Sequence, residues 1–152
     1  MDAREYFGNA RAAQSAIDRR YRIIESMRAR EAVRAQRYDV IGKGGGGTHD
    51  AMAATDARID AEAAARAEIA QLATEVEDAR AVCAGVRAAN PTQRWGDVLE
   101  CRYLECMDWR HVAQAMDMSE RQAHTDLDAA LDWVDLVGIA AARDGMGQSA
   151  LF

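Results

Sequence analysis

Alanine is the feature of this sequence that most constrains its fold. It occupies 33 of the 152 positions, whereas the chain contains one proline and two phenylalanines. Alanine has the highest intrinsic helix propensity, and the β-branched and aromatic residues that favour strands are sparse here. The composition therefore predicts an all-α protein built by packing helix on helix, and it argues against a β-sandwich, a β-barrel or a parallel sheet.

Net charge and cysteine usage indicate the setting in which the chain works. The net charge is −6, and all the basic residues are arginines apart from Lys43. No run of apolar residues is long enough to cross a membrane, and the first residues lack the apolar core of a signal peptide. Three cysteines, an odd number, are typical of reduced thiols in a helix-rich chain. We therefore expect a cytoplasmic protein without membrane contact, of a size that suits a regulator or adaptor better than an enzyme.

Residues 1–89 have the pattern of an antiparallel helical hairpin. Apolar residues recur every three or four positions over residues 1–41, as in an amphipathic helix. The glycine-rich segment 42–48 predicts a flexible loop, and its order differs from that of a phosphate-binding loop because Lys43 precedes most of the glycines. A second helix is predicted for residues 50–89, with a heptad-like seam formed by Ile69, Leu72, Val76, Ala79, Cys83 and Val86. This alanine-rich seam buries little area, so we expect it to associate with a second copy, giving a homodimer, or with the C-terminal part.

Residues 90–138 predict a separate small domain. Pro91 interrupts the helical pattern, and Gly138 is suited to end the last helix. Between them the pattern predicts three short helices, at roughly 93–105, 108–116 and 119–137. The tail 139–152 contains several small residues and is expected to be loose.

The last two of these helices predict a helix-turn-helix. Asp108 and Ser119 are suited to cap them, and Ala113 is small enough to let them approach. Asp117 can adopt the left-handed backbone that the turn between them requires, where glycine is usual. The buried face of the last helix is expected to consist of Ala123, Leu127, Ala130, Leu131 and Val134.

These residues resemble a known group of proteins. The pattern L-x-x-R-Y-L-x-x-x-x-W-x-x-V-A, starting at Leu99, is followed by S-x-R-x-x-x-x-x-L-x-x-A-L, starting at Ser119. It resembles region four of bacterial sigma factors. It is still more similar to a phage and prophage family of unknown function that includes relatives of the ArpU- and RinA-like late transcriptional regulators. Those proteins share the upstream order of charged helix, glycine-rich loop and charged helix, so the resemblance covers about residues 3–137. It implies sequence-specific binding of double-stranded DNA in a bacterial host, at a promoter and beside RNA polymerase.

The resemblance also implies which residues contact DNA. Arg121 and Gln122 match positions at which the recognition helix meets base edges or phosphates, and Arg110 matches a phosphate contact in the preceding helix. Arginine can pair with guanine O6 and N7, and glutamine with adenine N6 and N7. The full set of candidate DNA-binding residues is Arg110, Glu120, Arg121, Gln122, His124 and Thr125.

The distribution of charge along the chain leaves other hypotheses for its function open. Residues 93–138 carry four arginines against ten acidic residues, a net charge of −6, whereas residues 1–42 carry nine arginines against six acidic residues, a net charge of +3. Because phosphate neutralisation dominates DNA affinity, binding would depend on the arginine-rich first helix. Alternatively, the acidic helix-turn-helix is a non-DNA-binding adaptor that docks on a basic protein surface, for example on RNA polymerase. A third hypothesis is a small-terminase-like packaging protein, which also joins a helix-turn-helix to a coiled coil.

Other chemistry finds little support in the sequence. Cys101, Cys106, His111 and His124 do not have the spacing of a zinc site, so no metal is expected. Trp109 is expected in the core of the small domain. No Ser-His-Asp or Cys-His-Asp set has informative spacing, and we therefore expect no enzymatic activity, no cofactor and no small-molecule substrate.

Overall fold

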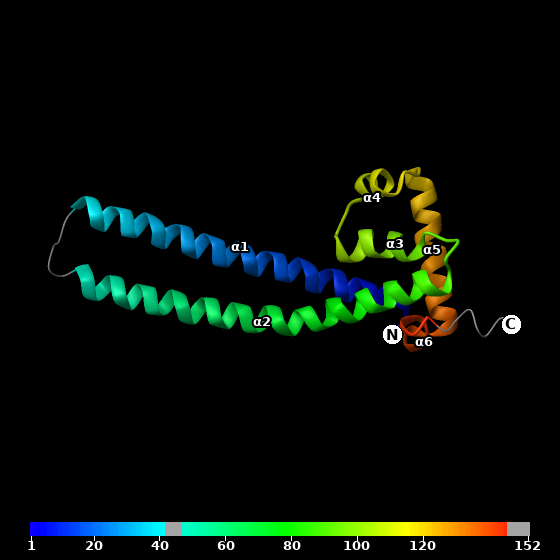
Figure 1. Cartoon of the computed structure of the whole chain (residues 1–152), viewed down its shortest axis with the longest axis horizontal. Coiled ribbons are helices and arrows are strands. Elements are labelled where there is room, and N and C mark those ends of the chain that lie inside the picture. Colours follow the sequence, from blue (N-terminus) through cyan, green and yellow to red (C-terminus); the bar gives the residue numbers. More distant parts are fainter. Residues whose placement is uncertain (42–46, 146–152) are drawn as a thin grey trace. The chain divides into compact units, whose positions relative to one another are not determined.

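The chain is all-α, as the composition predicts. The computed structural model describes residues 1–41 and 47–145, with the backbone alone described for residues 38–41 and 47–51. Across these ranges there is no strand, and the helices are α1 (Ala3–Ile41), α2 (Gly47–Ala89), α3 (Trp95–Leu99), the π-helix η1 (Glu100–Leu104), α4 (Trp109–Met116), α5 (Glu120–Val137) and α6 (Ile139–Arg143) (Figure 1). Most of the expected glycine-rich loop lies outside the described residues. The helix that we expected from residue 50 already begins at Gly47, and the glycine at its start costs only about 1 kcal/mol.

Contacts divide the chain into two compact units. The first unit combines Met1–Ser15 with the chain from Ala73 onward, and the second unit is the continuous segment Ala16–Leu72. We expected the boundary after residue 89, where the second long helix ends. It falls inside α1 and α2 instead, because the start of α1 and the end of α2 pack with the short helices.

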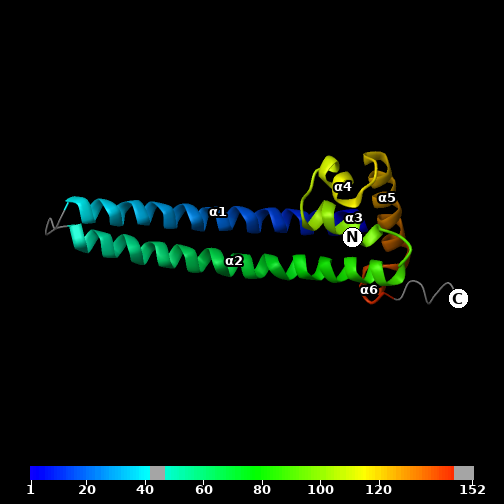
Figure 2. The ribbon, with the colours of Figure 1, turned by 45° about the horizontal axis from the view of Figure 1, so that its top comes forward.

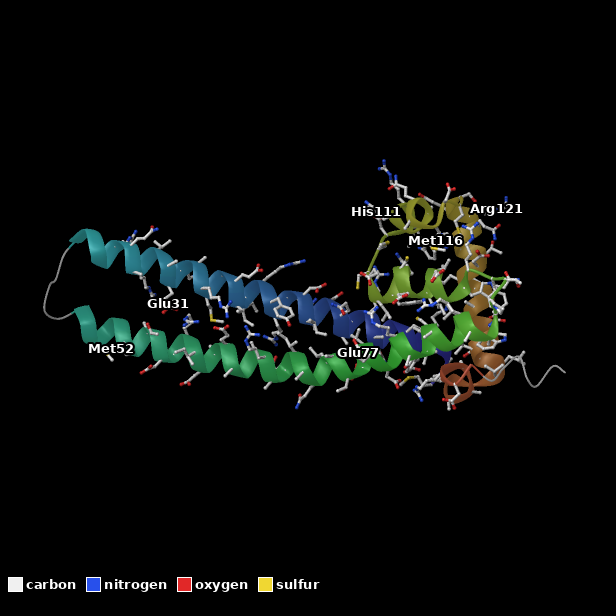
Figure 3. The ribbon with its side chains drawn as sticks, in the orientation of Figure 1. Glu31, Met52, Glu77, His111, Met116 and Arg121 are labelled. Carbon is white, nitrogen blue, oxygen red and sulfur yellow. The ribbon has the colours of Figure 1, made fainter. Side chains whose placement is uncertain are left out.

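The second unit is an antiparallel pair of helices with a polar centre. Its parts of α1 and α2 run side by side in both views (Figure 1 and Figure 2). Glu62 is only 8% exposed, and it accepts hydrogen bonds from Arg28, Arg58 and Arg66. The Arg28 guanidinium makes the largest contribution to holding the pKa of this carboxyl below its ordinary value. Glu31 lies on the side of α1 that faces α2, where it pairs with Arg58 (Figure 3). Removing Glu62 would leave three arginines without their shared counter-charge.

The core of the first unit is built around Phe7. This side chain is fully buried, and its ring stacks on Tyr103 with the centroids 5.5 Å apart. The later part of the predicted α2 seam is buried in the same unit, at Val76, Ala79, Cys83 and Val86. The short helices add the buried residues Val98, Leu99, Leu104, Val112, Leu127, Leu131 and Val134. At Cys83 the seam of α2 meets the C-terminal part, because its carbonyl oxygen would lie 2.7 Å from a Cβ added at Gly96; this is one of the two associations that the sequence predicts.

The C-terminal tail does not become loose at residue 139. It begins with α6, in which Ala142 is fully buried. This helix lies against α2 at Gly85, where an added Cβ would be 2.6 Å from the Arg143 carbonyl oxygen and 2.8 Å from the Ala142 carbonyl carbon. The expectation of a loose tail was wrong for residues 139–145, because local composition carries no signal of a contact made more than 50 residues away along the chain. The remainder of the tail lies outside the described residues.

A polar cluster fastens α6 to both long helices within the first unit. The Tyr6 hydroxyl donates to the Asp78 carboxylate, and an Arg143 amino group lies 2.8 Å from the same carboxylate. Burial, followed by the hydrogen bond to Asp78, raises the pKa of Tyr6 well above its ordinary value. The cluster therefore joins one residue each from α1, α2 and α6.

The three short helices lie close to their predicted positions. The bounds of α4 and α5 differ from the predicted ones by one residue at their starts. The first short helix continues from α3 into η1, where the Glu105 N–H donates to the Glu100 carbonyl at 2.9 Å in a five-residue turn. Cys106 follows with a φ of 55°. A π-turn has no distinct sequence pattern, and nothing in the helical periodicity predicted this one.

Candidate nucleic-acid interface

The turn between α4 and α5 is short and well defined. Asp117 adopts φ 52° and ψ 53°, the left-handed conformation that the sequence predicts for it. The N–H of Met118 donates to the Ala113 carbonyl at 3.0 Å and that of Asp117 to the Gln114 carbonyl, so two of the last carbonyls of α4 are satisfied. The reversal of direction between the two helices is therefore held by backbone hydrogen bonds.

Side-chain caps fix the starts of both helices. The Ser119 hydroxyl accepts from the Gln122 N–H at 3.0 Å, and the Asp108 carboxylate accepts from the His111 N–H at 2.9 Å. The His111 ring nitrogen Nδ1 is also 2.6 Å from Asp108. These hydrogen bonds, with the backbone one contributing most, hold the pKa of Asp108 below its ordinary value. Both predicted caps are confirmed.

Burial divides α5 into two faces. The buried residues of α5 are those predicted, namely Ala123, Leu127, Ala130, Leu131 and Val134. All six candidate DNA-binding residues are exposed: Arg110, Glu120, Arg121, Gln122, His124 and Thr125. Arg121 lies near the N-terminal end of α5 and His111 on α4 (Figure 3). The core therefore fixes the orientation of α5 and leaves polar side chains of its first turns accessible.

The exposed residues differ in what they already contact. The Gln122 amide nitrogen donates to Asp126 at 2.8 Å, and the Thr125 hydroxyl donates to the Arg121 carbonyl at 3.0 Å. Among the side chains that the structure describes, neither Arg110 nor Arg121 forms an ion pair or a side-chain hydrogen bond. These two guanidinium groups are therefore the most available donors on this surface.

The His124 side chain is engaged within the domain, whereas a residue that contacts bases needs a side chain that is free to reach them. Its ring stacks on Trp109, with the centroids 3.5 Å apart and the planes inclined by 26°. The Arg102 guanidinium lies 4.5 Å from the Trp109 ring centroid and donates to the Met107 carbonyl at 3.0 Å. Trp109 itself is half-buried, so it is not the enclosed core residue that we expected. The sequence carries no signal of this stack, because Arg102, Trp109 and His124 belong to three different elements.

Much of the acidic charge in this domain is engaged within the first unit. An Asp135 carboxylate oxygen accepts from the Ala3 N–H at 2.7 Å, at the start of α1, and Asp128 pairs with Arg4 at 3.2 Å. A carboxylate at the N-terminal end of a helix is stabilised by the helix dipole. These two acidic residues therefore hold α5 to α1, and they are less available to repel an anion than the sequence suggests.

Glu100 is engaged in the same way, by the end of α2. Its carboxylate lies 2.6 Å from Arg80 and 2.8 Å from Arg87, and Arg87 also lies 3.1 Å from Asp97. Acidic residues of the domain that have no ion pair among the described side chains are Asp117, Glu120, Asp126, Asp132 and Asp135, the last of which accepts only the Ala3 N–H.

The cysteines and histidines do not assemble into a metal site. Across residues 1–41 and 47–145, no group of three or more His, Cys, Asp or Glu side chains is arranged to hold a metal ion. Cys106 lies 3.8 Å from the Ser15 hydroxyl, within the first unit. Cys83 is fully buried, and burial raises the pKa of its thiol to about 12.

Comparisons with known proteins give no relative for this chain. No protein-family model matches it, and no curated protein and no solved structure is significantly similar to it. Over the described residues, no helix combines the length and the apolar character needed to cross a membrane.

Proposed function

We propose that this chain is a DNA-binding transcriptional regulator of the phage and prophage type, which binds a specific duplex sequence through α5. The observation that carries the proposal is the exposed first part of α5. The helix is held by a capped start and a buried apolar face, and it presents Arg121 and Gln122 on the opposite side. A recognition helix in the major groove uses residues at this end to contact bases.

The role proposed for each residue follows from the hydrogen-bond donors of its side chain. The Arg121 guanidinium suits the two acceptors of a guanine edge, and each such bidentate contact is worth about 1–3 kcal/mol of discrimination. The Gln122 amide suits an adenine, but it must first exchange its hydrogen bond with Asp126. Arg110 suits a phosphate oxygen, since it lies at the start of α4 and has no ion pair among the described side chains.

Other positions contribute less than the resemblance implies. His124 stacks on Trp109, so we assign it to positioning α5 rather than to reading bases. Thr125 bonds back to its own helix, and Glu120 bears the charge that suits a helix start. The proposed regulator acts as a homodimer, because one small module rarely buries enough surface for tight specific binding.

Fluorescence anisotropy with labelled duplexes tests the proposal. The probes are a randomised duplex pool and fragments of the DNA that neighbours the coding sequence, at low and near-physiological salt. We expect one fragment to bind in the nanomolar range at physiological salt, and the variant Arg121→Ala/Gln122→Ala to lose that selectivity. The matched control is Arg20→Ala/Gln93→Ala, which removes the same residue types from exposed positions outside α4 and α5.

Two outcomes would overturn the proposal. If the control variant loses selectivity as strongly as the α5 variant, α5 is not the reading element. If the wild-type chain fails to bind any duplex even at low salt, the acidic surface excludes DNA. The same helix should then be tested as a protein-binding adaptor, with RNA polymerase as the first candidate.

A further inference from the structure

We infer that the outward face of α1 in the second unit binds the phosphate backbone of duplex DNA. This inference rests on the proposed function, because it takes duplex DNA as the ligand, but it assigns a second contact surface. That surface supplies affinity without sequence selectivity. Five arginines define it, and we call them the arginine stripe: Arg19, Arg22, Arg30, Arg34 and Arg37.

The members of the arginine stripe share one side of the helix. At about 100° per residue, three of them fall within about 20° of one another, and the other two lie about 60° to either side. The opposite side of this segment carries Ile17 and Ile24, which are buried. All five arginines are exposed, and the stripe extends along about 27 Å of helix.

The arginines of the second unit fall into two groups according to their contacts. Those directed at the neighbouring helix are neutralised there: Arg20 lies 2.8 Å from Glu68, and Arg28 pairs with Glu62. In the described part of the second unit, no member of the arginine stripe forms an ion pair. The acidic side chains of α1 that flank the stripe are Asp18 and Glu25, four residues before and three residues after Arg22, while Glu31 at the other edge pairs with Arg58. Five exposed guanidinium groups that form no ion pair outnumber the two acidic residues beside them and attract a polyanion, and arginine matches phosphate oxygens with two parallel donors.

The scarcity of basic groups on the helix-turn-helix favours DNA as that polyanion. On the helix-turn-helix, Arg110 and Arg121 are the only arginines that have neither an ion pair nor a side-chain hydrogen bond among the described side chains. Affinity for duplex DNA depends on how many phosphates are neutralised, and two arginines neutralise few. Five additional phosphate contacts would steepen the dependence of log K on log salt by about 4.5. An anionic membrane shares the same charge, but a helix that lies in a membrane interface needs a large apolar face. Among the side chains that the structure describes, the large apolar ones exposed beside the stripe are Ile23 and Val33.

The salt dependence of binding by the full chain tests this inference. The probe is a labelled random-sequence duplex of about 40 base pairs, titrated over a series of salt concentrations. The variant Arg19→Gln/Arg30→Gln/Arg37→Gln removes three members of the stripe, and we expect the slope of log K against log salt to become shallower by about 2.7. Because the three side chains are exposed, helix content and thermal midpoint should remain those of the wild type, which circular dichroism checks.

A matched pair of single variants separates contact from net charge. Arg19→Gln and Arg20→Gln change the net charge equally at adjacent positions, but Arg20 is already neutralised by Glu68. We expect Arg19→Gln to reduce the slope by about 0.9 and Arg20→Gln to leave it unchanged within error. Equal reductions in both variants would show a general charge effect and overturn the inference.

Other outcomes of these experiments distinguish this inference from the proposed function. If stripe variants retain the full slope while Arg121→Ala/Gln122→Ala loses selectivity, the inference is wrong and the proposed function stands. If stripe variants lose slope but no fragment is selected, the inference stands and sequence recognition is wrong. If no duplex binds, both are wrong. Binding to vesicles of anionic phospholipid that is lost in the stripe variants, with unchanged DNA binding, would reassign the stripe to a membrane surface.

Discussion

Replacing Gly85 by alanine should release α6 from the first unit. The added Cβ would lie 2.6 Å from the Arg143 carbonyl oxygen and 2.8 Å from the Ala142 carbonyl carbon, and both are backbone atoms that no rotamer change can move. Real Cβ atoms need about 3.4 Å, so one helix must shift by most of an ångström or more. We expect α6 to move, because it has five residues and follows Gly138, whose φ of 89° marks a break between helices.

The expected magnitude follows from what α6 buries. Undocking exposes the Ala142 methyl group and part of Ile139, which together are worth about 2 kcal/mol at about 0.8 kcal/mol per buried CH₂. The partly exposed pair between Arg143 and Asp78 adds at most about 1 kcal/mol. Against this loss, replacing a helical glycine by alanine stabilises the helix by about 0.5–1 kcal/mol. The net loss of about 1–2.5 kcal/mol should lower the thermal midpoint by roughly 5–12 °C for a unit of this size, measured by circular dichroism.

The control is the same substitution at Gly8, which lies inside α1, where an added Cβ would meet no atom within 4 Å beyond its chain neighbours and the backbone of its own helix. Gly8→Ala should raise the midpoint, since it gains helix propensity without a clash. In a chain shortened to end at Gly138, Gly85→Ala should change sign and stabilise as Gly8→Ala does. A full-length Gly85→Ala protein that melts above the wild type would refute this reasoning and the docked position of α6.

Three other measurements address the local geometry. Asp117→Gly should preserve or raise stability while Asp117→Ala lowers it by about 1 kcal/mol, because position 117 has a φ of 52°; equal urea midpoints for the two variants would contradict the left-handed turn. Cys83 should resist alkylation at neutral pH in the folded chain and react after denaturation, since burial raises its pKa to about 12; peptide mass spectrometry should detect no early labelling at this position. The pKa of Asp78 is lowered mainly by the Tyr6 hydroxyl, so its contribution to stability is present above the unfolded value of about 3.9 and is lost as pH falls through the lower folded value. Asp78→Asn should therefore flatten the acid side of the stability profile, and an unchanged profile would count against the cluster.

Local sequence rules account for much of this fold. Helix propensity and three- or four-residue spacing predicted the long helices, and Asp108, Ser119 and Asp117 marked the ends of α4 and α5. These features could be predicted because each depends on residues within one or two helical turns. The buried face of α5 follows from the same short-range periodicity.

Contacts between distant residues could not be predicted in this way. No sequence feature around Gly85 indicates that a helix lies against it. In the sequence Asp128 and Asp135 have no apparent partners, whereas in the structure they contact residues at the start of α1. The stacking of His124 on Trp109 likewise depends on the crossing of two helices. Part of the candidate site was therefore identified correctly as exposed, while the availability of each side chain required the structure.

The hydrogen bond between Ala3 and Asp135 has a consequence for biosynthesis. It joins residues 132 positions apart, and the first unit is assembled from two separate stretches of chain. The second unit is one continuous stretch, whose ion pairs form within residues 16–72. During translation, at about 5–20 residues per second, the helices of the second unit can pair while the first residues still await α5. Until η1 and α5 emerge from the ribosome, Phe7 lacks its contact with Tyr103 and the start of α1 lacks its partners on α5, so this part of the chain is exposed to aggregation or chaperone capture during synthesis.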